Sequence, residues 1–192
     1  MDAYTVVLYL HLMSLFVGLG AGTVLAVCLF QLRAARTVEQ AVPFGVIAGK
    51  AGMFFPVAIL GLFGSGAYLV TDQWSWSTRW IDVGIAALVV LTIQGVGVAE
   101  RTAKKLEAAL HANGPGSLGT EARRMTLHPG LWVVEFSNLG LVFGIVWNMT
   151  QKPGLGGAIA AALGGYAVGA VLALLLTRAR QEELTAAPET AG

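Results

Sequence analysis

Charged residues are scarce in this chain. They make up 12% of its 192 residues, whereas about 25% is usual in soluble domains, and 56% of the residues are apolar. A soluble fold with so little charge could not cover its surface with polar groups, so the composition indicates an integral membrane protein. The net charge is only +1, and the sparse basic residues form no field that would attract nucleic acid.

Cysteine and the motifs of soluble enzymes are also missing. Cys28 is the only cysteine, which excludes an internal disulfide framework and a metal cluster held by cysteines alone. The sequence has no Walker-type loop, no H-E-x-x-H, no C-x-x-C and no G-x-S-x-G. These motifs carry the chemistry of common soluble enzymes, so the sequence leans away from an enzyme.

Long apolar runs are what the sequence has instead. Five of them are long enough to cross a hydrocarbon core about 30 Å thick: residues 4–32, 52–70, 81–98, 131–149 and 154–176. We therefore predict an all-α fold, a polytopic membrane helix bundle with five transmembrane helices. Residues 1–180 form one domain, and residues 181–192 form a polar cytoplasmic tail.

The basic residues predict the orientation of this bundle. Ten of the twelve Lys and Arg residues lie in the segments 33–50 and 99–130 and in the tail from Thr177, whereas the alternate connectors hold only Arg79 and Lys152. Cytoplasmic loops retain Lys and Arg, so the N-terminus is expected outside and the C-terminus inside. The tryptophans of the short connector 71–80 suit an aromatic belt at the outer interface.

Two connectors have a helical pattern of their own. Residues 100–112 continue the third span into water, with Glu100 and Lys104 in the favourable i, i+4 order, and the Gly- and Pro-containing segment 113–119 ends this helix. Between residues 33 and 49, Pro43 and mixed polarity predict a short interfacial helix at best.

Small residues recur at i, i+4 in several spans. Such residues let membrane helices approach closely, and they are found at Gly18 and Gly22, at Gly140 and Gly144, and along the fifth span at Gly157, Ala161, Gly165, Gly169 and Ala173. We interpret them as packing within one chain. The alternative is a seam with a second copy or with a partner helix.

His11 is the first candidate site residue, because ionisable side chains inside a span are functional hypotheses by default. Ser14, Gly18 and Gly22 share its side of the helix, and a neutral imidazole there could ligate haem iron through one nitrogen while a hydrogen bond holds the other. The simpler interpretation is a histidine that bonds a neighbouring helix. Asn148 and Met149, at the same predicted depth, are its expected neighbours.

Glu135 is the second candidate, with Asn138 on the same face of the fourth span. Lys50 is expected at the same surface, so an ion pair between Lys50 and Glu135 is the simplest explanation. A proton-relay or gating carboxylate is the functional alternative. Gln94 in the third span completes the buried polar set.

The order of these features resembles a known group of small bacterial membrane proteins. The resemblance rests on the run Tyr-Leu-His-Leu-Met-Ser-Leu-Phe-Val-Gly at residues 9–18, on Pro56 and Gly66-Ala-Tyr-Leu, on Trp80, and on Met149-Thr-Gln-Lys-Pro153. The group includes the copper-resistance D-type domain, membrane-embedded haem-dependent protoporphyrinogen oxidases and predicted integral membrane proteins of unknown function. It implies a multi-pass protein of the bacterial inner membrane.

The oxidase branch implies a haem-associated histidine in the first span, which His11 matches. It also implies a Lys shortly after Trp80, where this chain has Gly84, and an Asn-Glu-x-Pro motif, where residues 126–129 read Thr-Leu-His-Pro. Both departures disfavour that oxidase activity, so the branch of unknown function is the better match.

The resulting hypothesis is a membrane protein that binds a b-type haem or acts in membrane redox or haem handling. One alternative is a non-catalytic subunit that packs against other membrane proteins or a second copy through its glycine-rich faces. Another is an ion or small-solute permease. The lipid bilayer is the expected partner in each case, and nucleic acid is excluded.

Overall fold

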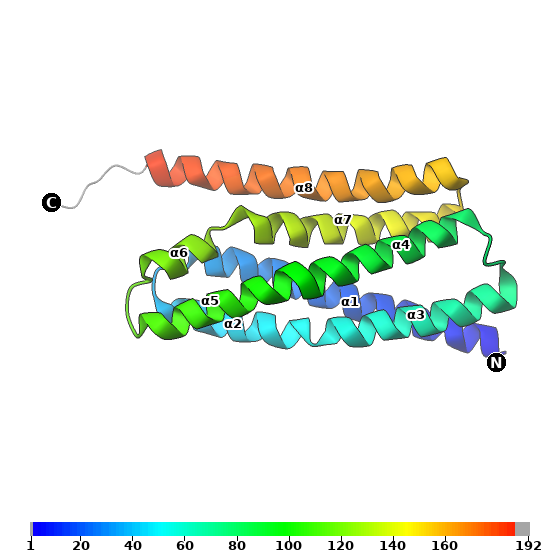
Figure 1. The fold of residues 1–192 in the computed structure, drawn as a ribbon, viewed down its shortest axis with the longest axis horizontal. Coiled ribbons are helices and arrows are strands. Elements are labelled where there is room, and N and C mark those ends of the chain that lie inside the picture. Colours follow the sequence, from blue (N-terminus) through cyan, green and yellow to red (C-terminus); the bar gives the residue numbers. More distant parts are fainter. Residues whose placement is uncertain (1, 187–192) are drawn as a thin grey trace.

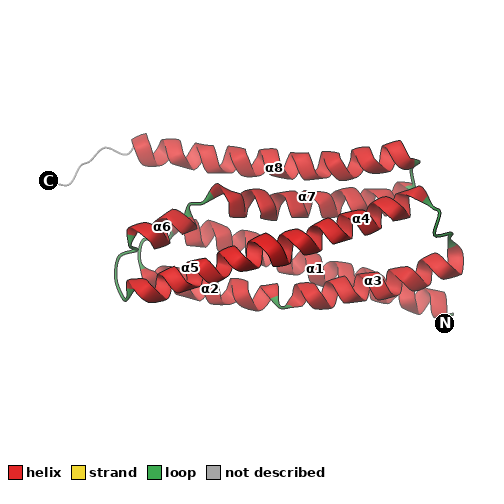
Figure 2. Ribbon diagram, viewed as in Figure 1, coloured by secondary structure: helices red, strands yellow, loops and turns green. Residues whose placement is uncertain are grey.

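The computed structural model describes residues 2–186 and consists of long helices that run side by side (Figures 1 and 2). The elements in that range are α1 (Ala3–Ala34), α2 (Val38–Gly52), α3 (Phe54–Gln73), α4 (Arg79–Gln94), the π-helical turn η1 (Gly95–Ala99), α5 (Glu100–Asn113), α6 (Thr120–Thr126), α7 (Pro129–Gln151) and α8 (Leu155–Ala186). Five helical stretches are long and apolar enough to cross a membrane. The predicted all-α membrane bundle is therefore confirmed at this level.

The second candidate span is longer than predicted. It runs from Val38 to Gln73, because α2 and α3 are separated only at Met53. The expectation of a short interfacial helix at best between residues 33 and 49 is wrong. Thr37 caps α2 by accepting a bond from the Gln40 N–H, and Pro43 removes only one bond of the ladder, in the second turn.

The third candidate span continues into α5 as predicted. Lys104 Nζ lies 2.6 Å from Glu100 Oε1, and the helix ends at Asn113. Gly114 and Gly116 follow with positive φ values of 68° and 107°, a conformation that glycine adopts without strain. The π turn η1 between α4 and α5 was not predicted.

One end of the bundle has an apolar cluster of its own, which we call the α5 end (Figure 1). Its buried residues come from α1 and its C-cap Ala35 and from α2, α5 and α6: Leu32, Ala35, Ala41, Leu106, Leu110 and Ala122. The apolar face of α5 thus packs on the helices of this end. Arg123 of α6 ties this end together by donating to the carbonyl oxygens of Arg33 and Ala35.

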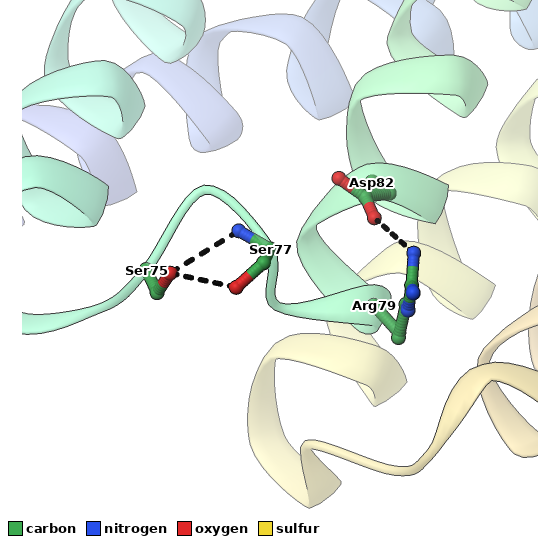
Figure 3. A network of polar contacts seen from close by, with 4 residues as sticks. All are labelled: Ser75, Ser77, Arg79 and Asp82. Atoms are coloured by element: carbon green, nitrogen blue, oxygen red, sulfur yellow. Dashed lines mark hydrogen bonds and ion pairs between the residues drawn. The ribbon is translucent and has the colours of Figure 1, made fainter.

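The opposite end holds tryptophans and the α3–α4 loop. Trp74 and Trp80 meet edge to face with ring centroids 5.5 Å apart, and Lys152 Nζ lies 4.7 Å from the Trp74 ring. In the loop, Ser75 Oγ bonds Ser77, and Arg79 lies 3.8 Å from Asp82 at the start of α4 (Figure 3). We call this the Trp74 end.

α7 and α8 form the closest helix pair, along the predicted small residues. A Cβ added at Gly140 would meet the backbone of Gly165, and one added at Gly144 would meet the backbone of Ala161. Gly169 likewise faces the backbone of Phe136. These residues are used within the chain, as predicted, so this face of α8 is not free to bind a partner helix.

The last helix extends past its predicted end. The fifth span was expected to stop near residue 176, but α8 continues as helix to Ala186. The predicted polar tail at 181–192 is thus helical in its first part. Residues 187–192 lie outside the described residues.

Candidate functional site

His11 lies where α1 packs against α3. Its side chain is buried, with 9% of the residue exposed, and its Nδ1 lies 2.9 Å from Ser65 Oγ of α3. A Cβ added at Gly66 would lie 3.3 Å from His11 Cε1, so a side chain at this position would crowd the ring. Glycine at 66 therefore lets the imidazole lie against α3.

Ser65 forms hydrogen bonds with both His11 and its own helix. The hydroxyl of Ser65 bonds the Gly61 carbonyl oxygen one turn back in α3. Either His11 Nδ1 or Ser65 Oγ can donate in the bond between them, depending on the tautomer of the imidazole. The ring also lies within hydrogen-bond reach of the Leu62 backbone of α3.

Ser14 lies beside His11 on α1, as the sequence predicted, but it serves the packing of the helices. Its hydroxyl donates to the Leu10 carbonyl oxygen at 2.8 Å. A Cβ added at Gly61 would collide with the Ser14 side chain, and one added at Gly18 would lie 3.3 Å from Ala58 Cβ. Ser14 and Gly18 therefore set the close approach of α1 to α3.

The neighbours of His11 are not Asn148 and Met149, contrary to the expectation from the sequence. Asn148 Nδ2 donates to the Ala158 carbonyl oxygen of α8 at 3.0 Å, and Met149 packs against a cluster formed by α4, α7 and α8. The expectation failed because similar depth does not place two helices side by side. α1 pairs with α3 at His11, and α7 turns this part of its surface to α8.

Glu135 is buried on α7 with 9% of the residue exposed. Its Oε1 would lie 3.4 Å from a Cβ added at Gly22 of α1. No hydrogen bond or ion pair reaches its carboxyl group within residues 2–186. A buried carboxyl group without a partner is unusual, because its charged form is costly away from water.

Lys50 is exposed on α2 and does not pair with Glu135, so the predicted ion pair is wrong. The continuous α2 helix places Lys50 beside a surface groove that also includes Phe16 and Val17 of α1. Gly22 turns another side of α1 toward α7. Lys50 therefore does not belong to the buried polar set.

α7 has further buried polar atoms without hydrogen bonds. Within the described part of the chain these are Trp132 Nε1, Ser137 Oγ, Asn138 Oδ1 and Asn148 Oδ1. Gln94, the last residue of α4, instead bonds Tyr166 of α8, with 3.2 Å between Nε2 and the phenol oxygen. The predicted pair of Glu135 and Asn138 thus lies on the helix that is richest in such atoms.

Arg33 is a buried residue that the sequence analysis treated only as a loop charge. It ends α1 with 6% exposed, its Nη2 donates to the Thr177 carbonyl oxygen at 2.8 Å, and its guanidinium lies 5.4 Å from the Trp132 ring centre. The apolar run up to Leu32 could have indicated the burial of Arg33, since a charged side chain directly after such a run can stay within the bundle. Arg33 links α1, α7 and α8.

Ser65 and Tyr166 were also missed by the sequence analysis. Ser65 lies in the glycine-rich stretch 61–66 of α3. A serine inside an apolar span is itself a signal, since it can bond across helices. Only the fold could show that its partner is His11.

Comparison of the chain with protein-family models, with curated proteins and with solved structures finds no match. The resemblance drawn from the sequence motifs therefore stays a prediction. What the geometry offers is two separate buried groups, His11 held by Ser65 and Glu135 without a partner.

Proposed function

We propose that this protein binds a b-type haem through His11 Nε2 and acts in membrane electron transfer or haem handling. The observation that carries the proposal is the hydrogen bond between His11 Nδ1 and Ser65 Oγ, which are 2.9 Å apart. A histidine that ligates a metal usually donates its other ring N–H in this way, which fixes the ring and its tautomer. With the imidazole proton on Nδ1, the pair of His11 and Ser65 would form that arrangement and leave Nε2 for the iron.

The donor set suits haem better than a bare metal ion. Within residues 2–186 no three His, Cys, Asp or Glu side chains converge, whereas a haem iron needs only one or two axial ligands from the protein. When bound, haem supplies one-electron redox chemistry. His11 would hold it, and Ser65 and Gly66 would set the plane of the imidazole.

The proposed setting is the bacterial inner membrane, with the N-terminus outside and the α5 end inside. The α5 end carries most of the basic residues, whereas the Trp74 end carries only Arg79 and Lys152. This distribution follows the positive-inside rule, and Trp74 and Trp80 suit the outer interface. The departures at Gly84 and at residues 126–129 argue against the protoporphyrinogen oxidase reaction.

Haem titration of the purified protein in detergent tests the proposal. Wild type should develop a Soret band that saturates at one haem per chain, and His11→Ala should not. His111→Ala is the matched control, because His111 is exposed on α5. A wild type without a saturable Soret band, or a His11→Ala variant that titrates as wild type does, would contradict the proposal.

Glu135 supports a second candidate, an ion or small-solute permease. An unpaired carboxyl group inside a span is typical of proton and cation pathways, and Glu135 lies on the helix with the unpartnered oxygens of Ser137 and Asn138. In proteoliposomes, Glu135→Gln should abolish proton or sodium flux, and Glu121→Gln, at an exposed glutamate, should not. Equal flux through the wild type and the Glu135→Gln variant would dismiss this candidate.

A further inference from the structure

A groove runs along the surface between α1 and α2, away from His11 and Glu135. It consists of two adjoining cavities of about 430 and 190 Å³, which share Val24 and Ile47. The larger one is in the volume range of small-molecule sites, about 300–1,000 Å³. We call the two together the α1–α2 groove.

The shape of the groove comes from small residues between aromatic ones. Gly20, Ala21 and Ala51 line the larger cavity, and Phe16 and Phe54 line it with exposed rings. A Cβ added at Gly20 would meet no atom within 4 Å. The space above Gly20 is therefore open and apolar.

Lys50 is the one charged residue among those that line the two cavities. It is exposed and makes no hydrogen bond or ion pair within residues 2–186. The nearest acidic residue on its own helix, Glu39, accepts instead from the Gly116 N–H. An ammonium group beside an apolar groove suits a ligand with one negative group and a long apolar part.

We propose that the α1–α2 groove binds one anionic phospholipid, with an acyl chain over Gly20 and Ala51 and the phosphate at Lys50. Both walls belong to helices that are apolar enough to cross a membrane, so the groove would face lipid. Basic pockets between membrane helices bind anionic head groups by the same charge complementarity. A helix from a second copy would fill the apolar part but would leave Lys50 without an anion.

Native mass spectrometry with phosphatidylglycerol or phosphatidylcholine in detergent micelles tests the proposal. Wild type should bind phosphatidylglycerol more tightly than phosphatidylcholine. Lys50→Gln should weaken the binding of phosphatidylglycerol about fivefold, the contribution of one lysine at an anionic lipid surface. It should leave the binding of phosphatidylcholine unchanged. Gly20→Leu should weaken the binding of both lipids, because the leucine side chain fills the groove.

Two control variants separate the groove from general effects. Gly64→Leu also adds a side chain in open space, on α3, and Lys105→Gln removes an exposed charge on α5; both should bind lipid as wild type does. Equal affinity of wild type for the two lipids, or phosphatidylglycerol binding by Gly20→Leu at the wild-type level, would overturn the proposal. So would a dimer that Gly20→Leu dissociates, because the groove would then hold a second copy.

Discussion

Ser65 of α3 holds His11 of α1 through a hydrogen bond of 2.9 Å between residues 54 positions apart in the chain. The Ser65 hydroxyl also bonds the Gly61 carbonyl oxygen one turn back in α3, so Ser65 ties the imidazole of α1 to the backbone of α3. The pair therefore connects the packing of α1 on α3 with the chemistry proposed for the site.

Replacing Ser65 by Ala should weaken haem binding by about 10- to 100-fold, the usual effect of removing the partner that orients a metal-bound histidine. Ser65→Thr keeps the hydroxyl and should restore most of the affinity. Ser77→Ala, in the α3–α4 loop (Figure 3), is the control. Unchanged affinity in Ser65→Ala, measured by Soret titration, would show that the bond does not support the ligand.

The glycine contact between α7 and α8 predicts opposite results for two neighbouring residues. Gly165→Leu would push against the backbone of Gly140, whereas a Cβ at Gly164 meets no atom within 4 Å. Overpacking of this kind costs about 1–3 kcal/mol, so Gly165→Leu should lower the midpoint of thermal unfolding in detergent. Gly164→Leu should leave it unchanged, and equal effects of the two variants would refute this packing.

Arg33 should matter for stability although it carries a charge at the end of a helix. Arg33→Met would remove the bond from the guanidinium to the Thr177 carbonyl oxygen, a loss of about 1.5–3 kcal/mol for a hydrogen bond to a charged group. Arg36→Met, at an exposed arginine three residues later, is the matched control. Thermal unfolding midpoints that fall equally in both variants would mean that Arg33 acts only as a surface charge.

Much of the fold could be predicted because a bilayer demands long apolar helices. The runs around His11 and Glu135 lie in helices near the predicted bounds, and the helix around Gly165 begins where predicted but continues to Ala186. The α2 helix was underestimated, because Pro43 was weighed without the buried contacts of Ala41 with the α5 end. Local sequence signals a helix breaker but does not show the packing that outweighs it.

The candidate site could be predicted only in part. His11 and Glu135 were found because ionisable residues inside spans are rare. Their surroundings were not, since Lys50 and Asn148 were placed beside them from depth alone. Depth follows from position along a helix, but neighbours depend on which helices touch and through which face, and that requires the fold.

The proposed orientation can be tested by cysteine accessibility in intact cells, on a background in which Cys28 is replaced by Ala. Trp76→Cys, at the Trp74 end, should react with a membrane-impermeant maleimide, and Ala109→Cys, on α5, should react only after the cells are opened. The reason is that cytoplasmic loops retain Lys and Arg. Labelling of both positions from the same side would contradict the proposed topology.

The central claim is that His11 is a haem ligand, and the haem content of the protein as it is made in cells tests it most directly. Wild type and His11→Ala would be expressed in haem-supplemented bacteria, purified in mild detergent and assayed by pyridine haemochrome. We predict a haem-to-chain ratio near one for wild type and near zero for the variant, with both folded by circular dichroism. A ratio near zero for wild type, or equal ratios in the two proteins, would contradict it.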